Sequence, residues 1–229
     1  MTGARLGLLH TVPALAVTFD DLLKRTGHGG PIVHVVDAGL LAAAVDHGVD
    51  DEVRAEVLRH VRHLADDGAD AILVTCSSIG EAVEEAARRV DVPVLRVDAT
   101  MAEEAVALAA DRAQGDRSGR IAVLATLAAT LGPTGRLLES RVREASSPVE
   151  VTARVVGGAA AARASGDQAG HDRLVADAIA EAASSADVVV LAQASMAAAA
   201  AGLDLDVPVL TSPEGGAAAL VAAVTRLPS

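Results

Sequence analysis

Aromatic side chains are almost absent from this sequence. Phe19 is the single phenylalanine, and the chain has neither tryptophan nor tyrosine. Proteins that bind nucleic acid stack bases on aromatic rings and attract phosphates with an excess of basic residues. This chain has 31 acidic against 19 basic residues and a formal net charge of −12. We therefore expect no nucleic-acid partner, and a small polar ligand rather than a flat nucleobase or flavin.

Cysteine is equally scarce, because Cys76 is the only one. A single cysteine excludes an intramolecular disulfide, and a chain of 229 residues is long enough to bury a core without a disulfide or a metal. Residues 1–5 also lack the charged and then apolar pattern of a secretory signal. These observations predict a cytoplasmic protein.

Long hydrophobic runs are missing as well. The longest uncharged run, Val188 to Leu203, is too short to cross a bilayer, so we expect no membrane span. Cofactor motifs are also absent: Gly27 to Gly30 precedes a predicted strand instead of following one, and there is no phosphate-binding G-x-x-x-x-G-K. His60 and His63 lie one turn apart on a charged helix, a pattern more typical of a solvent-facing surface than of a zinc site. The sequence therefore predicts neither a cofactor nor a bound metal.

Short β-branched runs alternate with longer segments rich in alanine and leucine, which is typical of parallel βαβ units. The predicted strands cover residues 6–9, 32–36, 72–75, 94–97, 121–124, 149–156, 188–191 and 207–210. We therefore predict an α/β fold with mostly parallel sheets.

The two halves of the sequence resemble each other. Asp70 and the apolar run after it match Asp187 and its run at an offset of 117 (187 − 70), and the Asp-Val-Pro-Val-Leu segments that begin at Asp91 and Asp206 match at 115 (206 − 91). Self-similarity at half the chain length indicates a duplication. We predict an N-terminal half over 1–115 and a C-terminal half over 116–229, related by a pseudo-twofold axis, with helices that can exchange between the halves. Ligands of such sheets bind beyond the carboxyl ends of the strands, so we expect the site in the cleft between the halves.

Polar residues follow several predicted strands. Cys76 comes at a strand-to-helix junction, where free backbone N–H groups favour a thiolate or a bound carboxylate. By the duplication, Cys76 corresponds to Gln193. The other strand-end residues that we expect to bind a carboxylate, or in the case of His10 to transfer a proton, are His10, Thr11, Ser77, Ser78, Thr126, Thr130 and Ser195.

These residues resemble the pattern of the aspartate/glutamate racemase superfamily, which includes hydantoin racemases, arylmalonate decarboxylases and maleate isomerases. The family places a cysteine and small polar residues after a strand in each half. Here Cys76-Ser77-Ser78 keeps the first motif, whereas Ala192-Gln193-Ala194-Ser195 lacks the second thiol. The resemblance implies a cofactor-independent enzyme with Cys76 as a catalytic residue, and it makes a homodimer or a larger assembly an expectation.

Loss of the second thiol leaves three functions open. Racemisation requires an acid or base on each face of the α-carbon, and Gln193 cannot exchange a proton, so His10 or His171 would have to serve the second face. A decarboxylase of malonate-type acids needs only one thiol, which protonates the anion that remains after the loss of CO₂. A protein that has lost turnover would bind a small carboxylate without changing it. We predict a racemase or isomerase that acts next to a small carboxylate through Cys76, with the other two functions as alternatives.

Overall fold

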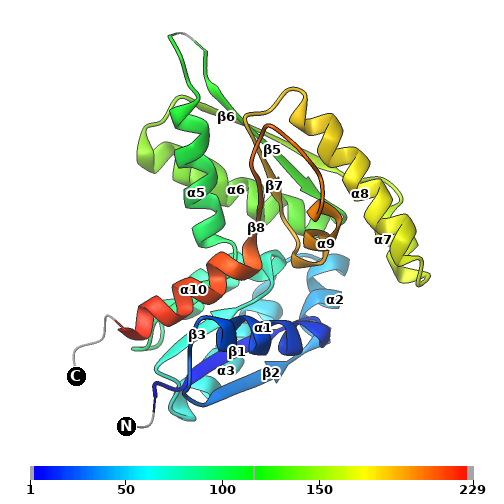
Figure 1. Ribbon diagram of the computed structural model, residues 1–229. Helices are drawn as coiled ribbons and strands as arrows, with labels where there is room; N and C mark the ends of the chain where they lie inside the picture. The colour runs from blue at the N-terminus through cyan, green and yellow to red at the C-terminus, as the bar shows by residue number, and fades with distance from the viewer. Residues whose placement is uncertain (1–2, 116, 226–229) are drawn as a thin grey trace. The chain divides into compact units, whose positions relative to one another are not determined.

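The computed structural model describes residues 3–115 and 117–225, which form two four-stranded parallel sheets with helices between the strands (Figure 1). The strand order is β2-β1-β3-β4 in the first sheet and β6-β5-β7-β8 in the second. The strands are β1 (Leu6–His10), β2 (Ile32–Val36), β3 (Ala71–Val74), β4 (Val94–Arg96), β5 (Gly119–Ala125), β6 (Val149–Val155), β7 (Val188–Leu191) and β8 (Val209–Thr211). The equal strand orders confirm the predicted α/β fold and its duplication.

The helices follow the same repeat. They are α1 (Ala14–Arg25), α2 (Ala38–Asp46), α3 (Asp51–Asp66), α4 (Gly80–Ala87), α5 (Ala99–Asp111), α6 (Ala128–Ala145), α7 (Ala159–Ala164), α8 (Gln168–Ala183), α9 (Ala197–Ala200) and α10 (Ser212–Thr225). Two short 3-10 helices, η1 (Ser77–Ile79) and η2 (Ala194–Met196), follow β3 and β7. Among the described residues, no helix is both long and apolar enough to cross a membrane.

The chain divides into two compact units that exchange a helix with each other. One unit comprises Met1–Thr100 and Pro213–Ser229, and the other comprises Met101–Ser212. Met101 in α5 packs in a core of the second unit, whereas Leu220 in α10 packs in a core of the first. The helix that follows the last strand of each half therefore packs with the other unit, whereas the predicted division after residue 115 follows the sequence repeat.

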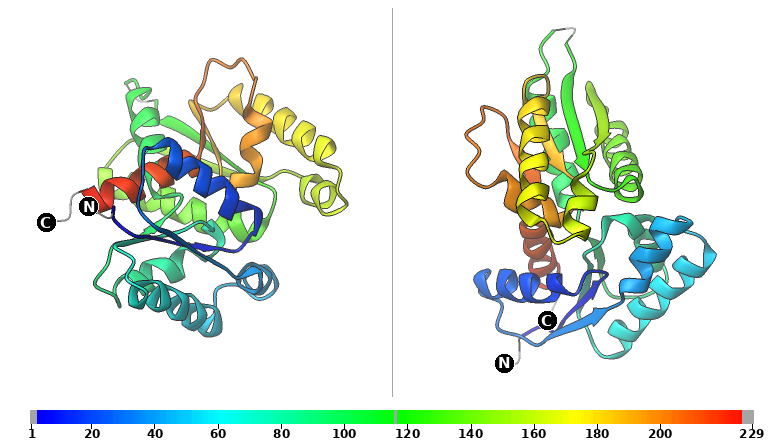
Figure 2. Two further views of the ribbon diagram at one scale, coloured as in Figure 1. Left: turned by 60° about the horizontal axis from the view of Figure 1, so that its bottom comes forward. Right: turned by 90° about the vertical axis from the view of Figure 1, so that its right-hand side faces the viewer.

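Each sheet is covered by helices on both faces, as the two views in Figure 2 show. In the first sheet, Leu8 packs toward Phe19 of α1, whereas Leu9 packs toward Val57 of α3. Successive side chains of a strand point to opposite faces, so buried strands of this kind are apolar throughout. This explains the continuous runs of valine, leucine and isoleucine in the sequence.

The second sheet is built in the same way. Val123 of β5 packs with Leu137 of α6 on one face, and Leu124 packs with Val175 of α8 on the other. Helix α8 begins after Asp167, whose Oδ1 accepts a hydrogen bond from the backbone N–H of Gly170 at 2.8 Å. Such a cap satisfies one of the free N–H groups of the first turn and sets where the helix starts.

Candidate functional site

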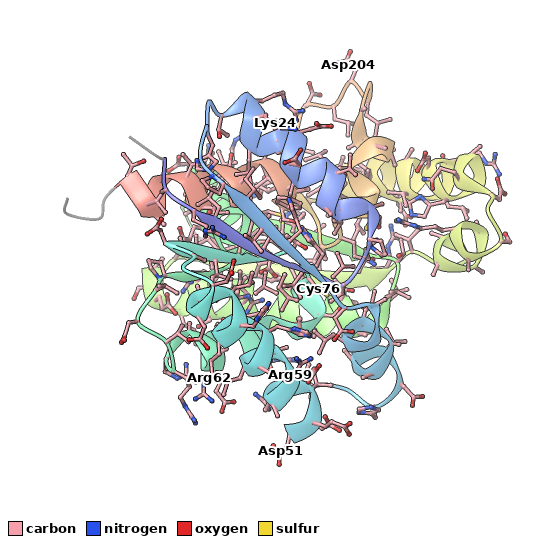
Figure 3. All side chains as sticks on the ribbon, turned by 90° about the horizontal axis from the view of Figure 1, so that it is seen from below. Lys24, Asp51, Arg59, Arg62, Cys76 and Asp204 are labelled. Atoms are coloured by element: carbon pink, nitrogen blue, oxygen red, sulfur yellow. The ribbon has the colours of Figure 1, made fainter. Side chains whose placement is uncertain are left out.

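Cys76 and Gln193 occupy equivalent places at the carboxyl ends of β3 and β7. Each is the last extended residue before a 3-10 helix, with φ −124° and ψ 111° at Cys76 and φ −128° and ψ 132° at Gln193. Cys76 is labelled in Figure 3. The backbone therefore repeats the same strand-to-helix junction in the two halves, and the difference between the halves lies in the side chains.

The Cys76 thiol is buried and surrounded by hydrogen-bond donors. Burial raises the pKa of Cys76, while the Thr11 hydroxyl and the backbone N–H groups of Ser78 and Ile79 act in the opposite direction. Burial has the larger effect, because a thiolate loses more solvation than these donors return. Burial therefore favours the protonated thiol, while the donors lower the cost of forming the thiolate or of holding the bound carboxylate that the sequence predicts at this junction.

Thr11, at the end of β1, provides a second polar group in the first half. Its side chain is 2% exposed, and although its hydroxyl lies close enough to lower the pKa of Cys76, no partner among the described residues meets the full hydrogen-bond geometry for Thr11 Oγ1. Ser77 and Ser78 are buried in η1. A buried hydroxyl without an acceptor is costly, so Thr11 is well suited to donate to a bound anion.

His10 belongs to a separate polar chain. Its Nδ1 lies 2.8 Å from Thr75 Oγ1, and its Nε2 lies 2.9 Å from His34 Nδ1. Its ring faces Phe19 on the α1 side of the sheet, whereas Cys76 packs in the core on the α3 side. Burial, reinforced by His34, lowers the pKa of His10 to about 4, so this imidazole is neutral near pH 7. The role of His10 in proton transfer stays a prediction.

In the second half, Thr126 holds the side chain of Gln193. The amide oxygen of Gln193 accepts hydrogen bonds from the Thr126 backbone N–H at 2.6 Å and from the Thr126 hydroxyl at 2.8 Å. With its oxygen occupied, the amide offers a ligand the donors of its NH₂ group. Thr130 is buried in α6, and Ser195 is half-buried in η2. The structure thus brings together Thr126 with Gln193 and Thr11 with Cys76.

The sequence analysis did not name Ser212 as a binding residue, and it named His171 only as a possible second base. Both side chains are buried. His171 Nε2 and Ser212 Oγ, like Thr11 Oγ1, have no hydrogen-bond partner among the described residues. Ser212 directly follows β8 and so occupies a strand end, which is the signal that could have identified it. His171 lies in the first turn of α8 and is fully buried, which no local pattern in the sequence indicates.

Asp37, Glu56 and His60 form the one group of potential metal ligands in the described part of the chain. One ligand atom of each lies within 4.8 Å of the others. These atoms are already paired, since His60 Nε2 lies 2.8 Å from Asp37 Oδ2 and the Glu56 carboxylate binds Arg59. Such pairing competes with a cation, and the group therefore supports a hydrogen-bonded contact between α3 and the end of β2.

Two shallow depressions lie at the opposite edge of the first sheet from Cys76. Both are lined by Thr26, Val221 and Thr225, and one of them also includes Gly3 and Ala4, which precede β1. Ligands of parallel α/β sheets bind at the carboxyl ends of the strands rather than at the amino ends. The chemistry of the strand ends is therefore the better guide to the site than these depressions.

The model of the Asp/Glu/Hydantoin racemase family matches residues 18–221. The chain belongs to this family. Among curated proteins, no sequence is similar enough to this family member to count as a match.

Solved structures share the racemase-family fold at low sequence identity. A glutamate racemase isoform from Bacillus anthracis is 18% identical with a TM-score of 0.75, covering 98% of this chain and 83% of its own. The aspartate racemase of Picrophilus torridus is 16% identical with a TM-score of 0.69, covering 99% and 96%. A glutamate racemase from Francisella tularensis, solved in complex with D-glutamate, is 15% identical with a TM-score of 0.68, covering 97% and 81%. At these identities the likeness shows the fold.

Proposed function

We propose that this chain is a cofactor-independent enzyme that acts at the carbon next to the carboxylate of a small acid, as a racemase or isomerase, with Cys76 as its proton-transferring thiol. The observation that carries the proposal is the environment of Cys76. The thiol is neutral because it is buried, yet the Thr11 hydroxyl and two backbone N–H groups stand beside it. A group that must give and take a proton has to exist as both thiol and thiolate during the reaction. These donors stabilise the thiolate once it forms.

The ligand of this proposal is a small carboxylate. Its negative charge would be met by donors rather than by a cation, since the candidates are hydroxyl, amide and backbone N–H groups. Thr11 and Gln193 have the clearest capacity to donate, because the Thr11 hydroxyl has no acceptor among the described residues and the oxygen of Gln193 is already used. The family match and the D-glutamate complex of a structural neighbour support an acid of this size.

Isotope exchange tests the proposal. The protein is incubated in D₂O with single enantiomers of aspartate, glutamate, a 2-hydroxy acid and a hydantoin, and deuterium at the α-carbon is followed by NMR. We expect at least one acid to exchange, and Cys76→Ser to reduce the exchange of at least one of its enantiomers by at least about a hundredfold. Exchange of both enantiomers that Cys76→Ser leaves unchanged would contradict the role of the thiol.

A decarboxylase of malonate-type acids is the second candidate, and the neutral thiol favours it specifically. Loss of CO₂ leaves an electron pair on the α-carbon, and a single protonated thiol can supply the proton that this carbanion needs. Gln193 would then serve only to bind a carboxylate. Release of CO₂ from a methyl- or phenyl-substituted malonate, with no α-exchange of the amino acids, would select this function over racemisation.

The same samples distinguish the third candidate function, a protein that binds carboxylates without changing them, from the two enzymes. An acid of the panel that raises the melting temperature, but is recovered without deuterium, inversion or loss of CO₂ at high protein concentration, would identify a binding protein. The matched control is Ser165→Ala, a change on the exposed surface after α7, which should leave both binding and exchange unaltered.

A further inference from the structure

The buried face of α8 carries a histidine where the equivalent helix of the first half carries a valine. Each buried residue of α3 has a buried counterpart in α8 at a constant sequence offset of 118 (171 − 53). In α3 these residues are Val53, Val57, His60, Val61 and Leu64, and in α8 they are His171, Val175, Ala178, Ile179 and Ala182, with Gly170 buried in addition. Val53 is an ordinary core residue, so the fold does not require a polar group at this position.

His171 continues the sheet-facing stripe of α8 toward the carboxyl edge of the second sheet. Val175, one turn further along α8, packs with Leu124 of β5 and Leu191 of β7. Because side chains alternate along a strand, Thr126 and Gln193 lie on the same face of the sheet as Leu124 and Leu191. The helix runs back along the sheet, so its first turn lies at the carboxyl ends of the strands, on the face that carries Thr126 and Gln193.

The hydrogen bonds of His171 define which ring nitrogen bears the proton. Nδ1 lies 2.8 Å from Asp172 Oδ1, and the same oxygen accepts a hydrogen bond from Gln168 Nε2 at 2.7 Å. A carboxylate only accepts, so Nδ1 is the donor, and in the neutral imidazole Nε2 carries the lone pair. An imidazole whose Nδ1–H is held by a carboxylate has the tautomer and the charge compensation of a general base.

The Nε2 atom of His171 has no hydrogen-bond partner in the described part of the chain. His171 is fully buried, and Nε2 finds no hydrogen-bond donor among the described residues. A buried acceptor that is left unpaired costs stability, and such a cost is kept where a ligand supplies the missing partner. Burial of an unpaired nitrogen is thus a second observation, independent of the helix start, that points to a ligand.

We infer that His171 is the proton-exchanging residue of the second half, where position 193 bears an amide in place of a thiol. This inference rests on the proposed racemase function. The C–H bond at the α-carbon of one enantiomer breaks, its proton passes to Nε2, and the electron pair stays on the carbon. The imidazolium exchanges this proton with solvent and returns a solvent-derived proton to the carbon, so that the α-hydrogen of this enantiomer exchanges and the imidazole is neutral again. Under the proposed function, Cys76 exchanges the α-hydrogen of the opposite enantiomer.

Asp172 is a positioning residue in this scheme. Its carboxylate holds the Nδ1–H and stabilises the imidazolium that forms when Nε2 takes a proton. Asp172→Asn keeps the size of the side chain but removes the charge. It should lower the rate of racemisation and shift the acid limb of the pH–rate profile, whereas a merely structural role would change stability without moving that limb.

A ligand-free measurement tests the tautomer. Long-range ¹H–¹⁵N NMR of the imidazole rings at pH 7 should show His171 protonated at Nδ1 and bare at Nε2. His171→Asn identifies the resonance, and the exposed His63 on α3 serves as the matched histidine. A proton on Nε2 in the free protein would overturn the inference.

Isotope exchange by enantiomer tests the chemistry. His171→Asn should reduce racemisation by at least about a hundredfold while Cys76 continues to exchange the α-proton of one enantiomer. Cys76→Ser should leave exchange of the opposite enantiomer, and His63→Asn should match the wild type. Full racemisation by His171→Asn, with loss of activity in Cys76→Ser, would overturn the inference and retain the proposed function. Wild-type activity in both variants would overturn the proposed function itself.

Discussion

The two halves of this protein have the same sheet and the same strand-to-helix junctions, but they carry different chemistry. The first half places a buried thiol, whose pKa is raised by burial, at the end of β3 with the Thr11 hydroxyl beside it. The second half places an amide at the same backbone position and ties its oxygen to Thr126. The comparison shows that the duplicated backbone supplies the position, whereas the side chains decide whether that position exchanges protons or donates hydrogen bonds.

The largest expected difference between the halves concerns an ion cluster that only the first half contains. Arg96, at the end of β4, binds both oxygens of Asp98 at 3.0 Å, and Arg96 is 8% and Asp98 0% exposed. Thr211 and Pro213 take these places in the second half. Asp98→Asn should destabilise the protein by about 3–5 kcal/mol in urea unfolding, because it removes the buried counter-charge of Arg96 and leaves this cation with the largely exposed Glu84 carboxylate.

Glu84→Gln is the control for this cluster. Glu84 also binds Arg96, at 2.6 Å, but its side chain is 48% exposed. Water screens such a pair, so this variant should lose less than about 1 kcal/mol. Equal losses for Asp98→Asn and Glu84→Gln would show that burial is not what makes the cluster important.

The first half should also contribute a loss of folding stability at acidic pH that the second half does not. Burial and His34 lower the pKa of His10 to about 4, whereas unfolded histidine titrates near its usual 6.5. Between these values the unfolded chain binds more protons than the folded protein, so stability falls as the pH drops from about 6.5 to 4, by up to about 3 kcal/mol. His10→Ala, which copies Ala125 of the second half, should remove this part of the pH dependence.

The measurement is the free energy of unfolding of both proteins at several pH values from 7 to 4.5. Groups remote from His10 titrate equally in the two proteins, so the difference between the curves reports on His10 together with its hydrogen-bonded neighbour His34. His10→Ala lowers stability at pH 7 because it leaves a cavity, but the gap to wild type should narrow as the pH falls. A constant gap would contradict the lowered pKa.

The role of Gln193 should be visible in binding rather than in stability. Gln193→Glu keeps an oxygen to accept the Thr126 hydrogen bonds, yet it replaces the NH₂ donors with a charge that repels a carboxylate. We expect the KM of the exchanging acid to rise by about tenfold, which corresponds to about 1.4 kcal/mol. Gln193→Asn, which retains the amide, is the control for charge, and an unchanged KM in Gln193→Glu would remove Gln193 from the ligand site.

The smallest effects compare two equivalent threonines. Thr126→Val deletes a satisfied hydroxyl and should cost about 1 kcal/mol of stability. Thr11→Val deletes a buried hydroxyl that has no full partner, so it should be neutral or slightly stabilising while it weakens carboxylate binding. Urea unfolding of the two variants side by side measures this contrast, and equal losses would show that Thr11 is as well bonded as Thr126.

Much of the fold followed from local patterns in the sequence. Each predicted strand lies on or beside an observed one, because a strand buried on both faces must be apolar throughout and its ends are marked by turn residues. The duplication and the family resemblance were confirmed. Cys76 and Gln193 were matched by offset alone, and the backbone angles at the two positions agree.

The candidate site was harder to predict from the sequence than the fold. The sequence placed His10 at a strand end, but not the contacts to Thr75 and His34 that determine its protonation. Those contacts join β1 to β3 and β2, and pattern analysis of one segment carries no information on its neighbours. For the same reason, the sequence predicted that helices can exchange between the halves but did not identify α5 and α10 as the helices that do so.

By itself, then, the sequence determined the parallel α/β repeat, its duplication and the residues at the strand ends, because these depend on periodicity and on matching one half to the other. Tertiary structure alone decided the burial that raises the pKa of Cys76 and the lack of a hydrogen-bond partner for His171 Nε2 among the described residues. Both depend on which atoms surround a side chain, and those atoms come from segments that are distant along the chain.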